Sequence, residues 1–219
     1  MAEVNLLDRY PRVKRPVEER GQCITEQHRG VARHFGKEYF DGDRLTGYGG
    51  YRYHPKFWQA TVRRFAEFYD LAEDCSVLDV GCAKGFMLYD FQAFLPQATF
   101  AGIDISPYAI AHSPASIRPF LCVGNAKALP FPDRSFDLVI SINTVHNLPI
   151  EECKRALQEI QRVSKHHAFV TMDAWRNDRE REQLMKWNLT ALTYLHVEEW
   201  IALFNEIGYG GDYYWFLVD

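Results

Sequence analysis

The run SVLDVGCAKGFMLYDF, residues 76–91, constrains the fold of this chain more than any other segment. Its apolar first part predicts a buried strand at Ser76–Val80, and its last part predicts a helix over Lys84–Phe94. Between them, the turn GCAKG would use Gly81 for the sharp change of direction and Gly85 for close contact between helix and strand. In doubly wound sheets ligands bind at the carboxyl ends of the strands, so this turn is the first candidate ligand site.

Strands continue to alternate with helices after this run. The apolar strands are expected at Thr99–Ile103, Phe120–Val123, Phe136–Ser141 and Ala168–Met172, and the intervening helices at Pro107–Ala111 and Ile150–Val163. Near-continuous apolar strands separated by helices are typical of a parallel sheet that is covered on both faces. The expected fold class is therefore α/β, with a doubly wound and mostly parallel sheet that carries helices on both faces.

The flanking segments complete the expected organisation. Two helices, Glu26–Phe40 and Pro55–Tyr69, precede the sheet; two more, Asn177–Met185 and Val197–Ile207, come after it and before a last strand at Tyr213–Val218. A chain of 219 residues is expected to form a single globular unit. Within it, residues 1–70 form an N-terminal extension and helical lid, and residues 71–219 form the core.

Residues beyond the turn indicate which ligand it holds. A dinucleotide-binding turn has the pattern G-x-G-x-x-G, whereas residues 79–85 read D-x-G-x-A-x-G, which disfavours NAD. The segment AGIDIS places Asp104 at the tip of the second strand, where a carboxylate can accept both hydroxyls of a ribose. The run VGNAKALPFPDRSFDLVISINTVHNL, residues 123–148, adds a third strand tip at Asn125 and a fourth strand that leads to His146.

Together these segments resemble the class I S-adenosylmethionine-dependent methyltransferases over residues 76–172, in particular the small-molecule branch with its signature LPF-x-D-x-SFDLV. The resemblance implies a Rossmann-like core, S-adenosyl-L-methionine as methyl donor, S-adenosyl-L-homocysteine as product, and no metal. It also implies that Asp79 holds the methionine amino group, Asp104 the ribose hydroxyls and Asn125 the adenine amino group. The full set of implied donor-binding residues is Asp79, Gly81, Cys82, Ala83, Gly85, Asp104, Ile105, Asn125, Ala126 and Ser141.

The sequence departs from the family pattern at two places. Asn125 stands where an Asp is usual, although its amide oxygen can still accept a hydrogen bond from the adenine amino group. Family sheets usually end in an antiparallel pair of strands, but only Tyr213–Val218 is evident here. Either residues 189–195 supply an irregular strand, or the sheet is one strand short.

The segment YFDGDRLTGYGGYRYH, Tyr39–His54, lies between two expected helices, ahead of the first strand. It is interpreted as a lid over the methyl group, with glycines that allow positive φ angles and close approach. The alternative is a turn-rich loop whose aromatic rings only cover the core. The candidate substrate-contacting residues are Tyr48, Tyr51, Tyr53, Arg44 and, at the tip of the fifth strand, Asp173.

Candidate catalytic residues are few. His146, after the fourth strand, is a candidate base or a residue that positions the methionine, and Asp43 in the lid is a candidate for orienting the acceptor. His166 and His167 are expected in a solvated loop ahead of the fifth strand. A metal-binding role is disfavoured for them, because no zinc-binding motif such as HExxH is present.

The predicted function is methyl transfer from S-adenosylmethionine to a small polar metabolite, to oxygen rather than nitrogen, with an acidic, phosphate- or sugar-containing acceptor. The preference for an anion rests on Arg44, Arg52 and a basic head, which consists of Arg9, Arg12, Lys14, Arg15 and Arg20. That head is alternatively a solvated, flexible arm. Alternative functions are methylation of a protein or peptide side chain, and a catalytically silent module that binds the donor or its homocysteine product.

Charge and composition disfavour several other classes. Lys and Arg total 25 against 29 Asp and Glu, a net charge of -4, so no nucleic-acid partner is expected. Membrane binding is not expected either, since no apolar run approaches the roughly 18 residues that span a bilayer. The start of the sequence has no apolar signal-peptide core, which favours a cytoplasmic location. The five scattered cysteines are expected to be reduced thiols, and the chain a monomer or homodimer.

Overall fold

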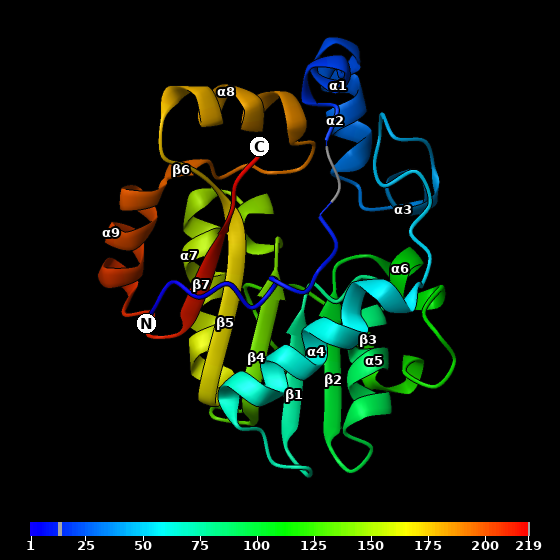
Figure 1. Ribbon diagram of the computed structural model, residues 1–219, viewed down its shortest axis with the longest axis vertical. Coiled ribbons are helices and arrows are strands. Elements are labelled where there is room, and N and C mark those ends of the chain that lie inside the picture. The colour runs from blue at the N-terminus through cyan, green and yellow to red at the C-terminus, as the bar shows by residue number, and fades with distance from the viewer. Residues whose placement is uncertain (13–14, 219) are drawn as a thin grey trace.

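A central parallel sheet forms the core of the protein, which we describe from a computed structural model for residues 1–12 and 15–218 (Figure 1). The strand order is β3-β2-β1-β4-β5-β6, and β7 also pairs with β5. Every pairing between these strands is parallel. The strands are β1 (Ser76–Val80), β2 (Thr99–Asp104), β3 (Leu121–Val123), β4 (Phe136–Ile142), β5 (Ser164–Trp175), β6 (Leu195–His196) and β7 (Asp212–Phe216).

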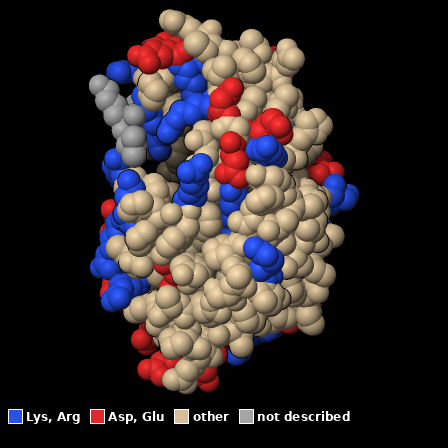
Figure 2. Space-filling model, turned by 90° about the vertical axis from the view of Figure 1, so that its right-hand side faces the viewer, with Lys and Arg blue, Asp and Glu red and all other residues tan. Residues whose placement is uncertain are grey.

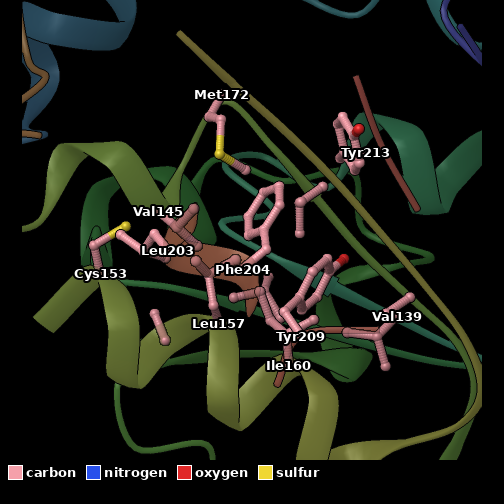
Figure 3. Packing of buried hydrophobic residues seen from close by; sticks show 14 of the residues in the cluster. Val139, Val145, Cys153, Leu157, Ile160, Met172, Leu203, Phe204, Tyr209 and Tyr213 are labelled. Carbon is pink, nitrogen blue, oxygen red and sulfur yellow. The ribbon is translucent and has the colours of Figure 1, made fainter. Parts of the chain in front are cut away.

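Helices cover both faces of the sheet, as the sequence predicts. On one face, α4 (Pro55–Tyr69) and α5 (Phe86–Phe94) pack their buried side chains against Leu138 and Ile140 of β4. On the other face, α7 (Ile150–Val163) and α9 (Val197–Ile207) pack against Val139. Figure 3 shows this second cluster, in which Leu157, Ile160 and Phe204 interlock with aromatic rings next to β7. Alternate residues of β4 therefore pack into opposite cores, which is why the run Leu138–Ile140 in its centre is apolar.

The carboxyl end of the sheet is covered by the remaining helices. Figure 1 shows α1 (Val17–Cys23), α2 (Glu26–Ala32), α3 (Lys37–Asp41) and α8 (Asp178–Trp187) at the end where β5 finishes. The short α6 (Pro107–Ala111) follows β2, and single 3₁₀ turns lie at Arg118–Phe120 and Val145–Asn147. No helix of the described segments is long and apolar enough to cross a membrane.

The C-terminal edge of the sheet shows whether residues 189–195 supply a further strand. Residues 189–195 are mostly irregular and contribute only Leu195 to the two-residue β6, which pairs with the end of β5. The last strand, β7, lies parallel to β5, so the antiparallel pair usual in the family is absent from the described part of the chain. The outer edge of β7 is covered by the N-terminus, because Val4 N–H donates to the Tyr213 carbonyl at 2.9 Å and Tyr213 N–H to the Ala2 carbonyl at 3.0 Å.

Two predicted segments are wrong in detail. The single helix expected over Glu26–Phe40 is two helices, α2 and α3, because Phe35 between them adopts a left-handed conformation (φ 49°) and its carbonyl accepts a hydrogen bond from Ser106 Oγ at 2.5 Å. The strand expected at Ala168–Met172 starts earlier, since Ser164 already pairs with Phe136 of β4. His166 and His167 therefore lie within β5 rather than in a loop.

The N-terminal head is packed rather than solvated along its first part. Leu6 is fully buried, the Tyr10 ring lies edge-on to Trp58 with ring centroids 4.9 Å apart, and Arg9 forms an ion pair with Glu67 at 3.1 Å. Lys14, which belongs to the same basic head, lies outside the described residues. All five cysteines are free thiols, as expected.

Candidate active site

Two adjoining cavities open along the carboxyl ends of β1, β2 and β4. The larger, about 510 Å³, extends from the turn after β1 to the N-terminal segment and α8, and the smaller, about 150 Å³, lies beside the end of β2. Both are lined by Gly81, Ala83 and Asn143, so they form one continuous cleft. This is the place where doubly wound sheets bind ligands.

The turn after β1 is shaped by backbone that only small residues tolerate. Gly81 has φ 84° and donates its N–H to the Ile103 carbonyl at 2.7 Å, and a Cβ at this position would overlap the side chain of Thr144. Ala83, with φ 51°, is held in a left-handed conformation that L-residues seldom adopt. Strained backbone of this kind is typical of ligand-binding turns, where it exposes main-chain groups to a ligand.

Asp79 is the buried carboxylate of the larger cavity. Its side chain is 4% exposed, and no donor among the described residues forms a hydrogen bond with it. Burial, and secondarily the nearby Asp104 carboxylate, raise the pKa of Asp79 to about 8. A buried carboxylate without a protein partner fits a cationic ligand group, and the amino group of a methionine moiety is one.

The smaller cavity presents the residues expected to bind a nucleoside. Asp104 is oriented by backbone N–H groups of Ala83 at 2.7 Å and Ser106 at 2.8 Å, which oppose the rise in its pKa that burial causes. Ile105 is 50% exposed in this cavity, an apolar surface that a flat base could cover. Asn125 and Ala126 also line it, and the Asn125 amide oxygen accepts the Lys127 N–H at 3.1 Å.

Four predicted site residues do not line either cavity. Ser141 is fully buried in the sheet and donates to the Val80 carbonyl at 2.9 Å, while Tyr53 donates to Asp90 at 2.6 Å. Asp43 accepts the N–H of Leu45 at 2.8 Å and so stabilises its own loop. Gly85, with φ 70°, caps the start of α5. In the described segments, no group of three or more His, Cys, Asp or Glu side chains is arranged to hold a metal ion.

His146 is buried in a polar network at the end of β5. Its Nδ1 accepts the backbone N–H of Asp173 at 3.1 Å, so the ring proton of the neutral form lies on Nε2, which is 3.6 Å from Asp173 Oδ2. Burial lowers the pKa of His146 and raises that of Asp173. Asn188 Nδ2 donates to the same Asp173 oxygen. The basic nitrogen of His146 is thus already occupied, and the ring is better placed to position Asp173 than to accept a proton from substrate.

A buried ion pair fastens the Tyr39–His54 segment, which we call the lid, to the turn after β1. Lys84 Nζ, from that turn, donates to both carboxylate oxygens of Asp41 (2.8 and 2.7 Å) and to the Tyr51 carbonyl at 2.8 Å. Tyr108 O–H donates to Asp41 as well, at 2.8 Å. These contacts hold the start of the lid against the turn after β1. Tyr48 and Tyr51 of the lid line the larger cavity.

Glycines let the lid fold back on α3. A Cβ at Gly47 would overlap the Tyr39 carbonyl group, so only glycine permits this approach. Of the four lid glycines, Gly49 and Gly50 have positive φ angles (73° and 103°), while Gly42, like Gly47, is needed for close approach. The rings of Tyr39, Tyr48 and Tyr51 contact one another in series, with centroid separations of 5.1 and 4.7 Å.

Four arginines line the far side of the larger cavity: Arg12, Arg15, Arg20 and Arg44, which we call the arginine cluster. Figure 2 shows Lys and Arg side chains gathered around a hollow on this side of the molecule. The sequence predicts Arg44 as a substrate-contacting residue, and it predicts the other three only as parts of the basic head. Neither Lys84 nor Asn143 was singled out, and only the position of Lys84 inside the GCAKG turn could have drawn attention to it.

Comparison with known proteins agrees with this geometry. A family model described as a methyltransferase domain matches residues 77–167. A protein of Encephalitozoon cuniculi that is named as a methyltransferase is 30% identical over 159 residues, which cover 65% of this chain and 71% of the relative. A solved structure, the YcgJ protein of Bacillus subtilis, superimposes with a TM-score of 0.55 at 19% identity over 67% of this chain and 66% of that one.

Two further relatives have names that state an acceptor. An Arabidopsis thaliana tRNA (carboxymethyluridine(34)-5-O)-methyltransferase is 35% identical over 128 residues, and a fatty-acid O-methyltransferase of Mycolicibacterium smegmatis is 32% identical over 115 residues. These matches cover 58% and 50% of this chain but only 30% and 37% of the two relatives.

The chain belongs to the class I S-adenosylmethionine-dependent methyltransferases. S-adenosylmethionine is the cofactor that this membership implies. The cavities carry the residue types that this donor requires: an unpartnered buried carboxylate at Asp79, an oriented carboxylate at Asp104 and the uncovered apolar side chain of Ile105.

The Asp79 carboxyl should release a proton when a ligand with a methionine amino group binds. Since its pKa is about 8 in the protein alone, it is mostly protonated at pH 7, and pairing with an ammonium group ionises it. We expect S-adenosylhomocysteine binding at pH 7 to release about one proton, measured by calorimetry in buffers of different ionisation enthalpy. The isosteric Asp79→Asn variant should release none; equal release by both proteins would contradict this role.

Asp41→Asn should destabilise the protein and weaken donor binding together. The change leaves the Lys84 ammonium, whose side chain is only 6% exposed, without its counter-ion, which costs about 3 kcal/mol of unfolding free energy. Glu152→Gln is the matched control, because the Lys127–Glu152 pair is one-third exposed and worth about 1 kcal/mol or less. Urea unfolding and donor titration measure the two effects. Equal losses in the two variants would show that the Lys84–Asp41 pair has no special role.

Proposed function

We propose that this methyltransferase methylates an oxygen of a small anionic acceptor, held in the larger cavity between the donor-binding turn and the arginine cluster. The observation that carries the proposal is the arginine cluster, which places four guanidinium groups on the wall of a cavity of about 510 Å³. Arginine is the side chain best suited to planar anions, because its donors match the two oxygens of a carboxylate or phosphate.

The residues of the chain would act mainly by positioning and by excluding water. S-adenosylmethionine supplies an electrophilic methyl group on a sulfonium, and the acceptor oxygen must lie about 3–3.5 Å from it, in line with the bond that breaks. Tyr48 and Tyr51 of the lid and Trp187 at the end of α8 enclose this space from two sides. The rings would shield the reacting atoms from water.

A tRNA nucleotide is the second candidate acceptor. It is favoured by the Arabidopsis relative, whose name gives tRNA as its substrate. Against it stands the net charge of -4, which lacks the excess of basic residues that binding an RNA backbone requires. The predicted alternative of a protein or peptide side chain is supported by no feature of the cavity.

Label transfer separates these acceptors. The purified protein is incubated with methyl-labelled S-adenosylmethionine and a cell extract divided into low-mass, RNA and protein fractions. We expect label in the low-mass fraction, in a compound that binds to an anion-exchange resin. Label confined to RNA or to protein would overturn the proposal in favour of the corresponding alternative.

Arg44→Gln should weaken acceptor binding selectively. Loss of one charge-assisted hydrogen bond, worth about 1.5–3 kcal/mol, raises the acceptor KM roughly 10- to 100-fold. Arg44 is suitable because its side chain is exposed and donates no hydrogen bond to any described residue. Arg155→Gln, at an exposed position of α7 that lines neither cavity, is the control and should leave KM unchanged. Steady-state kinetics with the compound labelled above measure both; an unchanged KM in Arg44→Gln would remove this residue from the acceptor site.

A further inference from the structure

The arginine cluster is built around an aromatic surface rather than spread over an open face. The Arg20 guanidinium lies over the Trp187 ring, 4.7 Å from its centroid, and donates to the carbonyls of Trp187 (3.2 Å) and Arg44 (2.6 Å). Arg15 lies 4.4 Å from the centroid of the Phe216 ring. Stacking on rings fixes the orientation of a guanidinium group.

The cavity carries more positive charge than the single carboxylate of the methyl donor can balance. Among the described lining residues only Asp79 and Asp173 are acidic, and Arg12, Arg20 and Arg44 form no ion pair with any described residue. The donor brings one carboxylate, one ammonium and one sulfonium, so its own net charge is positive. Asp79 is placed for the ammonium, which leaves Arg12, Arg20 and Arg44 in excess of the single donor carboxylate. The remaining positive charge calls for an anionic acceptor.

Among the described residues that line this cavity, His146 is not set up to remove a proton from a hydroxyl. His146 Nδ1 already accepts the Asp173 N–H, and its Nε2 carries the ring proton. Asp173 is turned to its own network, with Oδ2 accepting from Asn188 and lying near His146. A hydroxyl acceptor would need a base that takes its proton, whereas a carboxylic acid has a pKa of about 4 and is already ionised at neutral pH.

Two of the relatives have names that give acceptors with the same functional group. The Arabidopsis protein is named for carboxymethyluridine and the mycobacterial protein for a fatty acid. A nucleoside and a lipid have little in common except that both of these molecules carry a carboxyl group. The chain shares 35% and 32% identity with these two relatives over the matched residues.

We infer that the group methylated by this enzyme is a carboxylate and that the product is a methyl ester, an inference that rests on the proposed function. One carboxylate oxygen forms a bond to the methyl carbon as the bond from that carbon to sulfur breaks, and the bonding electron pair stays on sulfur. The sulfonium becomes a neutral thioether, the carboxylate becomes a neutral ester, and no proton moves. The arginine cluster binds the second carboxylate oxygen and directs the first toward the methyl group.

The stability of the transferred label in base tests this inference. The full chain is incubated with methyl-labelled S-adenosylmethionine and two acceptor sources: the low-mass cell extract, and probe sets that share one hydrocarbon skeleton, such as hexanoic acid, hexanol and hexyl phosphate. Methyl esters release labelled methanol in mild base, but methyl ethers, methylamines and methyl phosphates do not. We expect the label to be released as methanol, and the acid of each probe set to be methylated or to compete best.

The possible results separate the carboxylate inference from the proposed function. Low-mass product whose label survives base would overturn the carboxylate inference while leaving small-molecule methylation in place. No label in any low-mass compound, from a protein that binds S-adenosylhomocysteine, would overturn the proposed function and this inference with it. Turnover supplies a second readout, since a step without proton transfer runs equally fast in D₂O and H₂O; clear slowing in D₂O would indicate a base and contradict the inference.

Discussion

The ion pair between Lys84 and Asp41 joins the two parts of the chain that methyl transfer needs in one place. Lys84 belongs to the turn after β1, whose shape suits the donor, and Asp41 is the last residue of α3 and part of the lid. The pair is supported by Tyr108 and by the Tyr51 carbonyl, and a second anchor runs from Ser106 to Phe35. The position of the lid tyrosines therefore depends on the same turn that is expected to hold the donor.

Charge is divided along the cleft in a way that suits two ligands. The buried carboxylates Asp79 and Asp104 lie at the ends of neighbouring strands, while the arginine cluster lies across the larger cavity. A donor that carries ammonium, sulfonium and ribose groups is complementary to the first side. An acceptor that carries a negative charge is complementary to the second, and the reacting atoms would meet between them. The Nδ1 lone pair of His146 already accepts the Asp173 N–H, so this histidine does not act as a base. That favours an acceptor that is already ionised.

The sheet and the position of the acidic strand tips in the cleft could be predicted because their signals are local. Apolar strands, glycine turns and acidic strand tips lie within short stretches, and Asp79 and Asp104 face the cleft as expected. The break in the Glu26–Phe40 helix could not be predicted, because it depends on Ser106, which lies 71 positions away. The arginine cluster likewise combines Arg12, Arg15 and Arg20 with Arg44, which meet only after the head folds onto α8. The family resemblance implies a site role for Ser141, and residue type suggests one for Tyr53 and Asp43, but each side chain is hydrogen-bonded within the protein.

A crystal structure of the protein with S-adenosylhomocysteine and acetate, as a minimal carboxylate, tests the central claim most directly. We predict that the product amino group lies within hydrogen-bond distance of Asp79, that its sulfur faces the larger cavity, and that acetate is bound by the arginine cluster on that side of the sulfur. If the sulfur faced away from the cluster, or if the arginines bound only the carboxylate of S-adenosylhomocysteine itself, an anionic acceptor at this site would be contradicted.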